Sequence, residues 1–224
     1  MKELIKKYKH AWVLSYFIIY LIWFFALEQF IVDYHPVYIK LDDLIPFNEW
    51  FVIPYIVWFG YIFLTVAFLF FNSVQDFYKC TAFLFIGMTI CLIIYTIWPN
   101  GQNLRPNLDT LGRDNILIDL VRLFYKNDTS TNVCPSIHVF NSIGAHIAIS
   151  RNATLKKYKW ITPISFILMV LICLSTVFLK QHSAFDIITG VILGFIMYLF
   201  VYARSDYKQH NKASQGNQEA DSLI

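Results

Sequence analysis

A histidine and an aspartate four residues apart are the most chemically suggestive pair in the sequence. They end the polar stretch Ser175 to Asp186, STVFLKQHSAFD, which lies between two apolar runs, where polar residues are costly unless they have a function. If a helix begins near Ser183, the carboxylate of Asp186 reaches back to the imidazole of His182 across about one turn. That pairing would keep one ring nitrogen protonated and leave the other free to attack as a nucleophile. Ser183 and Asp186 also match an S-x-x-D capping box, so this stretch alone leaves catalysis and capping equally open.

A second histidine lies in the stretch NDTSTNVCPSIHVFNSIG. Pro135 and Ser136 predict a helix start with Ser136 near the N-cap and His138 in the first turn. The free N–H groups and positive dipole of a helix start can bind an anion. Taken alone, His138 also fits a hydrogen-bonded interfacial histidine, and His146, two turns deeper, is assigned to packing or an internal hydrogen bond.

A cation lies in a third stretch, IWPNGQNLRPN, whose proline and glycine indicate a helix exit. Arg105 at this exit could anchor the helix end by snorkelling, or its guanidinium could bind a phosphate or carboxylate. The stretch Asp114 to Tyr125 follows, with apolar residues at helical spacing and charges on the other face. We expect it to lie in the membrane plane as a lid or belt.

The composition indicates the elements that hold these residues. The 224-residue chain is 57% hydrophobic, well above the level of a soluble domain, and therefore predicts an all-α, polytopic membrane bundle. A spanning helix needs about 20 mostly apolar residues. Five runs reach that length, and a sixth is shorter and more polar, which gives six predicted spans: residues 11–30, 51–71, 80–98, 136–150, 160–179 and 185–203.

The Lys and Arg residues predict the orientation of these spans. They are concentrated in the segments that become cytoplasmic if the N-terminus is inside, so both termini are expected in the cytoplasm. Residues 1–204 are expected to form one membrane domain with its catalytic core at about 80–200, and residues 205–224 a disordered cytoplasmic tail. Between the spans, residues 31–50 predict an irregular outer segment and residues 72–79 an inner turn. No disulfide framework, C-x-x-C metal pair or nucleic-acid patch is found in the sequence.

Under this topology the polar candidates share the outer face of the membrane although they come from three separate hairpins. They are Arg105, Ser136, His138, Ser175, Lys180, His182 and Asp186. Two histidines, one with a carboxylate partner, together with cations and N–H donors, are what two-step phosphoryl transfer without a metal or other cofactor requires. A metal site built from the histidines and the aspartate is possible by ligand type, but the nearby cations favour a bound anion.

Three segments carry a family resemblance. RP at 105–106, CPSIH at 134–138 and S-x6-H-x3-D from Ser175 to Asp186 resemble the signature motifs of the type-2 phosphatidic acid phosphatase superfamily. The resemblance covers roughly residues 80–200 and implies a six-helix core with an outward-facing site. It also implies that His182 is the nucleophile, Asp186 its orienting carboxylate and His138 the general acid and base. Arg105, Ser136 and Ser175 would bind phosphate.

The chain departs from the family pattern at three positions. Trp98 stands where a lysine is expected, Ile137 where a glycine is expected and Thr176 where an arginine is expected. We expect Lys180 to replace one of the two missing cations, and Arg113 or Arg122 to fold over as the other. The reduced positive charge, with P-S-x-H and K-Q-H motifs, resembles the branch related to inositolphosphorylceramide and sphingomyelin synthases.

These features leave three functions open. The first is a lipid phosphate or pyrophosphate phosphatase at the outer face of the plasma membrane, acting on a phospholipid or isoprenoid phosphate. The second is a phosphotransferase that moves a phospho-headgroup to a lipid alcohol. The third is a non-enzymatic transporter, which predicts charged or broken helices near the membrane midplane, whereas the predicted spans are nearly free of charge there.

Replacing His182 with alanine separates the enzymes from the transporter. We expect the His182→Ala protein to lose function completely, because the nucleophile is gone, and loss of His138 to cripple turnover, since acid-base help is worth about 10²- to 10⁴-fold. Activity of each variant against a phosphorylated lipid is the measurement. Function retained in the His182→Ala protein contradicts a phosphohistidine.

Overall fold

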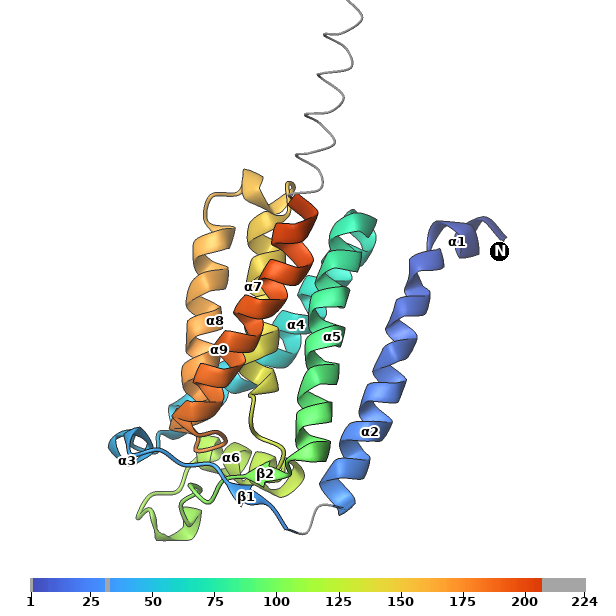
Figure 1. Ribbon diagram of the computed structural model, residues 1–224. Coiled ribbons are helices and arrows are strands. Elements are labelled where there is room, and N and C mark those ends of the chain that lie inside the picture. The colour runs from blue at the N-terminus through green and yellow to red at the C-terminus, as the bar shows by residue number, and fades with distance from the viewer. Residues whose placement is uncertain (1, 31–32, 207–224) are drawn as a thin grey trace, which may run out of the picture.

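The computed structural model describes residues 2–30 and 33–206, which form a bundle of long helices capped at one end by short elements (Figure 1). The helices are α1 (Lys2–Lys7), α2 (Tyr16–Phe30), α3 (Leu41–Leu44), α4 (Val52–Asn72), α5 (Val74–Ile97), α6 (Ile116–Asn127), α7 (Ile137–Arg151), α8 (Ile161–Phe178) and α9 (Ala184–Tyr198). Two short strands are β1 (His35–Pro36) and β2 (Asn100–Gly101). Most of the predicted tail, from residue 207 on, lies outside the described residues.

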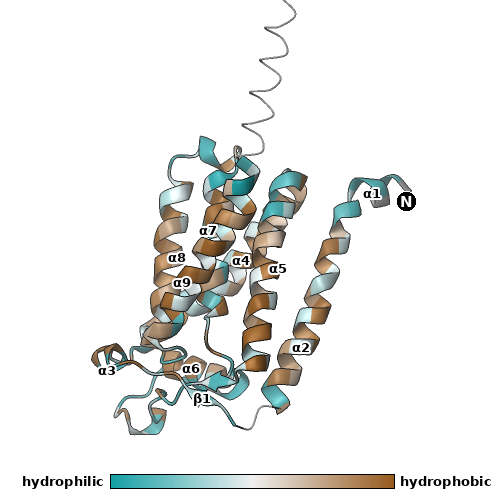
Figure 2. Cartoon of the chain, in the orientation of Figure 1, coloured by the Kyte–Doolittle hydropathy of each residue, from teal (hydrophilic) through white to brown (hydrophobic). Residues whose placement is uncertain are grey.

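The expected all-α membrane bundle is confirmed. Among the described residues, five helices are long and apolar enough to cross a membrane: Lys9–Phe30, Glu49–Asn72, Val74–Ile97, Ile161–Phe178 and Ala184–Asp206. Figure 2 shows hydrophobic residues along these helices and more hydrophilic ones at the two ends of the bundle. The predicted inner turn at 72–79 is wrong, because α5 begins directly after Ser73, whose hydroxyl caps the helix by accepting from the N–H of Asp76 at 3.3 Å.

The short sixth helix, α7, lies at the centre of the bundle. It packs against α4, α5, α8 and α9, so its polar residues are shielded from lipid by its neighbours. Its N-cap is Ser136, as predicted, because the serine hydroxyl accepts from the N–H of Val139 at 3.4 Å. His146, also as predicted, makes an internal hydrogen bond, 3.1 Å from Nδ1 to Oγ of Ser165.

Two phenylalanines lock α7 onto α5. The ring of Phe140 on α7 lies over Gly87 of α5, and the ring of Phe83 on α5 lies over Gly144 of α7. The two rings stack on each other with centroids 4.9 Å apart, and both are fully buried. Because His138 is two residues before Phe140, this packing also fixes the start of α7.

The capping elements close one end of the bundle, opposite the end at which α1 lies (Figure 1). α6 lies across this end and buries Ile118 and Val121 against the start of α4, with its charged residues outside. The segment predicted as irregular contains β1 and α3, and β1 pairs in parallel with β2. The capping elements thus connect segments that are far apart in the sequence, at the end where the candidate site residues lie.

A methyl group at Gly87 should disrupt this packing. A Cβ at Gly87 would lie 1.9 Å from Cζ of Phe140, whose ring is fully buried. We expect Gly87→Ala to destabilise the protein by about 1–3 kcal/mol, the usual cost of overpacking. Gly60→Ala is the control, since a Cβ there meets nothing within 4 Å. Thermal unfolding in detergent compares the two variants, and equal midpoints would contradict the interlocked packing.

Candidate active site

The two histidines and the aspartate form one hydrogen-bonded chain. Nδ1 of His182 lies 3.2 Å from Oδ2 of Asp186, and Nε2 of His182 lies 3.3 Å from Nδ1 of His138. A carboxylate accepts but does not donate, so it holds the proton on Nδ1 of His182 and leaves Nε2 with a free lone pair. His138 therefore donates its Nδ1–H to the nitrogen that is equipped to act as a nucleophile.

The turn between α8 and α9 places His182 in this chain. The carbonyl of Thr176 accepts from the N–H groups of Gln181 and His182, at 2.9 and 3.0 Å, which closes the end of α8. Lys180 takes the left-handed conformation that such a helix end requires, with φ of 53°. Since glycine is the residue usually found there, the lysine is held in a less favoured conformation by its surroundings.

Asp186 caps α9 and also contacts His182. Ser183 is the N-cap of α9, and Asp186 completes a capping box with it, since its Oδ2 accepts from the N–H of Ser183 at 3.0 Å. The same oxygen faces His182. The cap fixes the carboxylate so that it can orient the ring, and the two roles do not compete.

Asp42 is a further buried carboxylate at this turn, which sequence reasoning missed. Its Oδ2 accepts from the hydroxyl of Ser183 at 2.6 Å, and its Oδ1 accepts from the N–H of Ala184 at 2.7 Å. Only 2% of Asp42 is exposed. The residue comes from α3, so a capping element holds the start of α9, and the only sequence signal was an acidic pair in a loop.

Two amide side chains hold the backbone on either side of the histidines. Asn100 accepts from the N–H groups of Val133 and Cys134 at 3.0 and 2.8 Å, just before α7. Gln102 donates to the carbonyl of Lys180 at 2.8 Å, just before His182. Both side chains are fully buried. They lie in the stretch IWPNGQNLRPN, which the sequence indicated only as a helix exit. The polar residues at alternate positions, 100 and 102, were the available sign in the sequence of a buried role.

Arg105 joins this framework and does not line the cavity described below. Its guanidinium donates to the carbonyls of Tyr125, Asp128 and Thr129, at 2.8–3.1 Å. It also donates to Oε1 of Gln181 and lies over the ring of Tyr125. Burial lowers the pKa of Arg105, but an arginine remains charged at neutral pH. Its connection to the histidines is therefore through Gln181.

Two of the other three predicted phosphate ligands, Lys180 and Ser175, are directed elsewhere. Nζ of Lys180 donates to the backbone carbonyl of Asp42 at 2.7 Å, and burial lowers the pKa of this lysine. The hydroxyl of Ser175 donates to its own helix, to the carbonyl of Ile172. Ser136 is fully buried and close, since its N–H donates to the carbonyl of Asp186 at 3.2 Å.

The two arginines considered as replacement cations are also engaged. Arg113 pairs with Glu49 at 2.8 Å, and Arg122 pairs with Asp109 and Asp119 at 3.0 and 2.6 Å. Neither is among the described residues that line the cavity beside the histidines.

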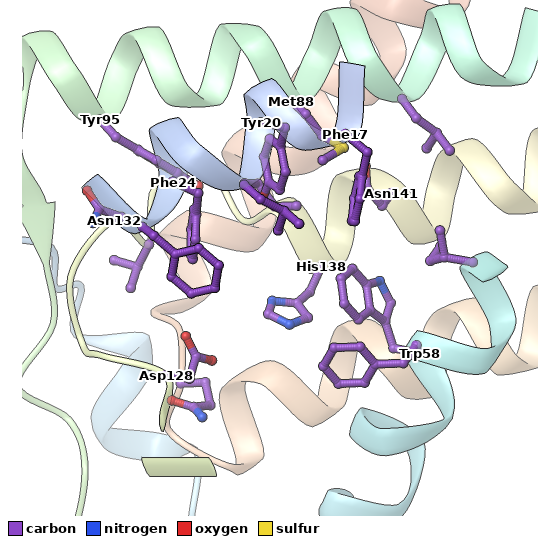
Figure 3. A pocket seen from close by; sticks show the side chains of 18 of the residues that line it. Phe17, Tyr20, Phe24, Trp58, Met88, Tyr95, Asp128, Asn132, His138 and Asn141 are labelled. Carbon is purple, nitrogen blue, oxygen red and sulfur yellow. The ribbon is translucent and has the colours of Figure 1, made fainter. Parts of the chain in front are cut away.

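A cavity of about 570 Å³ opens beside the histidines (Figure 3). Apolar and aromatic side chains of α2, α4 and α5 form most of its wall, and His138 and His182 line it together with Gln181. Residues of the loop after α6, including Asp128 and Asn132, form a polar region of the wall. His138 itself packs against Tyr55 and Trp58 of α4, with ring centroids 4.8 and 4.4 Å away. A site for an apolar molecule with one polar end is thus joined to the histidine pair.

The fold and the site define a helical membrane protein with a paired-histidine centre of the kind used in phosphoryl transfer. The family model described as the PAP2 superfamily matches residues 81–210, more than half of the chain, and the chain belongs to this superfamily. The resemblance inferred from the three motifs is thereby confirmed, and the protein is a membrane enzyme of the phosphoesterase or phosphotransferase kind. No curated protein and no solved structure matches the chain significantly.

Asp42 should matter for activity although it does not contact either histidine. We expect Asp42→Ala to destabilise the protein by about 2 kcal/mol, since it leaves the hydroxyl of Ser183 and the N–H of Ala184 without an acceptor. We also expect turnover to fall about tenfold or more, because the turn that carries His182 would shift once these hydrogen bonds are lost. Thermal unfolding and phosphate release measure the two effects.

Asp43→Ala is the matched control, since Asp43 is the exposed neighbour and its carboxylate accepts only from Tyr38 among the described residues. Equal effects of the two substitutions would show that Asp42 does not position the site.

Proposed function

We propose that the protein hydrolyses a phosphate or pyrophosphate monoester lipid through a phosphohistidine on His182, without a metal, at the outer face of the plasma membrane. One observation carries the proposal: the two histidines of the hydrogen-bonded chain Asp186, His182, His138 line an apolar cavity large enough for part of a lipid. The apolar wall favours a lipid over a water-soluble ester. The outer location rests on the distribution of Lys and Arg between the segments.

The first step makes a phosphorus–nitrogen bond. Nε2 of His182 attacks phosphorus while the bond to the lipid oxygen breaks, and Asp186 stabilises the cationic ring that forms. His138 enters this step protonated on both ring nitrogens, a form that the bound phosphate stabilises, and it gives its Nδ1 proton to the departing alkoxide, so the lipid leaves as an alcohol and His138 becomes neutral. Since the two rings are in contact at 3.3 Å, the entering phosphoryl group has to separate them.

The second step returns the enzyme to its starting state. His138, now neutral, takes a proton from water, and the water oxygen attacks phosphorus as the bond to His182 breaks. Inorganic phosphate is released, and both histidines recover their protons and lone pairs. Asp186 remains the acceptor for Nδ1 of His182 throughout.

Gln181 offers a donor for the phosphoryl oxygens. Its Nε2 is buried without a hydrogen-bond partner among the described residues, and its side chain lines the cavity beside His182. Its other amide atom, Oε1, accepts from Arg105, which polarises the amide and strengthens it as a donor. This arrangement would let Arg105 favour a bound phosphate although the guanidinium is held by backbone carbonyls.

A second candidate function is transfer of a phospho-headgroup to a lipid alcohol. The specific observation is that no lysine or arginine is among the described residues that line the cavity, whereas Asp128 is. A monoester carries up to two negative charges and a diester one, so a weakly positive site favours the diester. In this case the lipid alcohol replaces water in the second step.

Phosphate release from the purified protein in detergent with EDTA tests both functions. The lipids are phosphatidate, phosphatidylglycerophosphate, isoprenyl pyrophosphate and diacyl phospholipids, each with and without an alcohol acceptor. We expect acceptor-independent release of phosphate from a monoester or pyrophosphate. A new lipid formed only with acceptor, and no phosphate, would show the transferase instead.

Single substitutions test the role of each histidine in the same assay. We expect His182→Ala to abolish turnover and His138→Ala to reduce it by about 10²- to 10⁴-fold. His35→Ala is the control, because His35 is exposed on β1 and is not among the residues that line the cavity.

Radiolabelled phosphate should be incorporated into the unaltered protein and not into the His182→Ala protein, which would identify His182 as the site of the intermediate. Label retained in the His182→Ala protein would contradict a phosphohistidine on His182.

A further inference from the structure

Asn141 has a polar side chain that the catalytic chain does not use. It lies on α7, three residues after His138 and on the same side of the helix, and it lines the cavity. Figure 3 shows His138 and Asn141 projecting from α7, with Phe17 and Tyr20 of α2 nearby. Asn141 is only 3% exposed, and its Oδ1 has no hydrogen-bond partner among the described residues.

An unpaired amide in such surroundings is costly. A buried amide oxygen that has lost its hydration and accepts no hydrogen bond carries the full free-energy cost of its desolvation. Buried threonines in the bundle avoid this loss, since Thr65 and Thr81 each donate to a carbonyl of their own helix. The hydroxyl of Tyr202 is also buried without a partner among the described residues, but it does not line the cavity. Because Asn141 does line the cavity, its unpaired amide indicates a partner that binds there.

Trp58 has the complementary group on the same wall. Its Nε1–H is also buried without a partner among the described residues, and its ring lies 4.4 Å from that of His138 between centroids. An asparagine amide can accept and donate, whereas an indole only donates. The wall of the cavity thus holds an unpaired acceptor, Oδ1 of Asn141, and an unpaired donor, Nε1–H of Trp58, next to the two histidines.

The position of Asn141 along α7 indicates which part of a bound lipid it would contact. α7 starts at the site and runs away from it, so Asn141 lies about 4.5 Å further along the helix axis than His138. Beyond it the lining residues of α2, α4 and α5 include Phe17, Val66 and Leu84, which have no polar group. With phosphorus at His182, the atoms a few bonds from phosphorus face Asn141, and the chains continue among the apolar residues.

We propose that Asn141, with Trp58, binds the polar backbone of a glycerolipid or sphingolipid phosphate and so selects these lipids over polyprenyl and plain alkyl phosphates. An ester carbonyl, hydroxyl or amide close to phosphorus satisfies the two unpaired groups. A polyprenyl or alkyl chain brings only hydrocarbon to this place and leaves both groups unpaired. The inference rests on the proposed function, since it concerns the substrate of that site.

The unaltered protein provides the first test. Phosphate release is measured from phosphatidate and ceramide 1-phosphate, and from geranylgeranyl phosphate and hexadecyl phosphate, in the same mixed micelles. We expect kcat/KM to be about tenfold or more higher for the first two lipids, the effect of one hydrogen bond with a buried partner. Equal or higher values for the last two would overturn the proposal.

Substitution of Asn141 provides the second test. We expect Asn141→Leu to lower kcat/KM about tenfold for phosphatidate and to leave hexadecyl phosphate unchanged, with Asn141→Ser between the two. Thr81→Val is the control, since it removes a buried hydroxyl that does not line the cavity, and it should affect both lipids equally. An equal loss on both lipids in Asn141→Leu would show a structural role instead.

A binding measurement separates this inference from the proposed function. The His182→Ala protein leaves the lipids intact, so the rise of its unfolding temperature with each lipid measures binding alone. Phosphatidate should stabilise it more than hexadecyl phosphate does, and Asn141→Leu in the same background should remove the difference. If the unaltered protein releases phosphate from none of the lipids, the proposed hydrolysis is wrong, while the binding difference still supports the role of Asn141. Equal stabilisation by the two lipids contradicts that role.

Discussion

The site depends on one contact, the 3.3 Å between Nδ1 of His138 and Nε2 of His182. The two rings belong to different hairpins, one at the start of α7 and the other in the turn before α9. A displacement of either backbone by an ångström or two would separate the donor from the lone pair that it meets, because a hydrogen bond weakens steeply outside its narrow range of distance and angle. Much of the surrounding structure can be understood as keeping these two backbones in place.

Apolar packing alone cannot provide that precision. Contacts between hydrophobic side chains are not directional, and within a membrane they gain little over contacts with lipid. The interlocked rings of Phe83 and Phe140 fix α7 on α5, but the loops beyond the helix ends require hydrogen bonds. Asn100, Gln102 and Asp42 supply them from buried side chains, so the loops of the capping end are held by polar contacts in addition to the apolar packing of α6.

The parts of the fold and site that could be predicted are those determined by spacing along the chain. The span positions follow from apolar runs, and the caps at Ser136 and Ser183 follow from residue types at a helix start. Asp42 could not be found in this way, because its partner Ser183 is 141 residues away. The direction of Lys180 was unpredictable for the same reason: a flexible side chain takes the nearest acceptor, here a carbonyl in α3, which no local pattern reveals.

No lysine or arginine lines the cavity among the described residues, and this has a physical consequence for how the proposed site would stabilise charge. A lysine or arginine facing an apolar cavity would lose its hydration and would be stabilised only while an anion is bound. A neutral amide such as that of Gln181 loses far less when the cavity is empty, and its dipole is already fixed by Arg105. The arrangement keeps the two terminal nitrogens of the Arg105 guanidinium hydrogen-bonded to backbone carbonyls in the absence of substrate. It also limits the charge that the site can balance, and therefore favours a phosphoryl group whose negative charge is small or is partly neutralised by a proton.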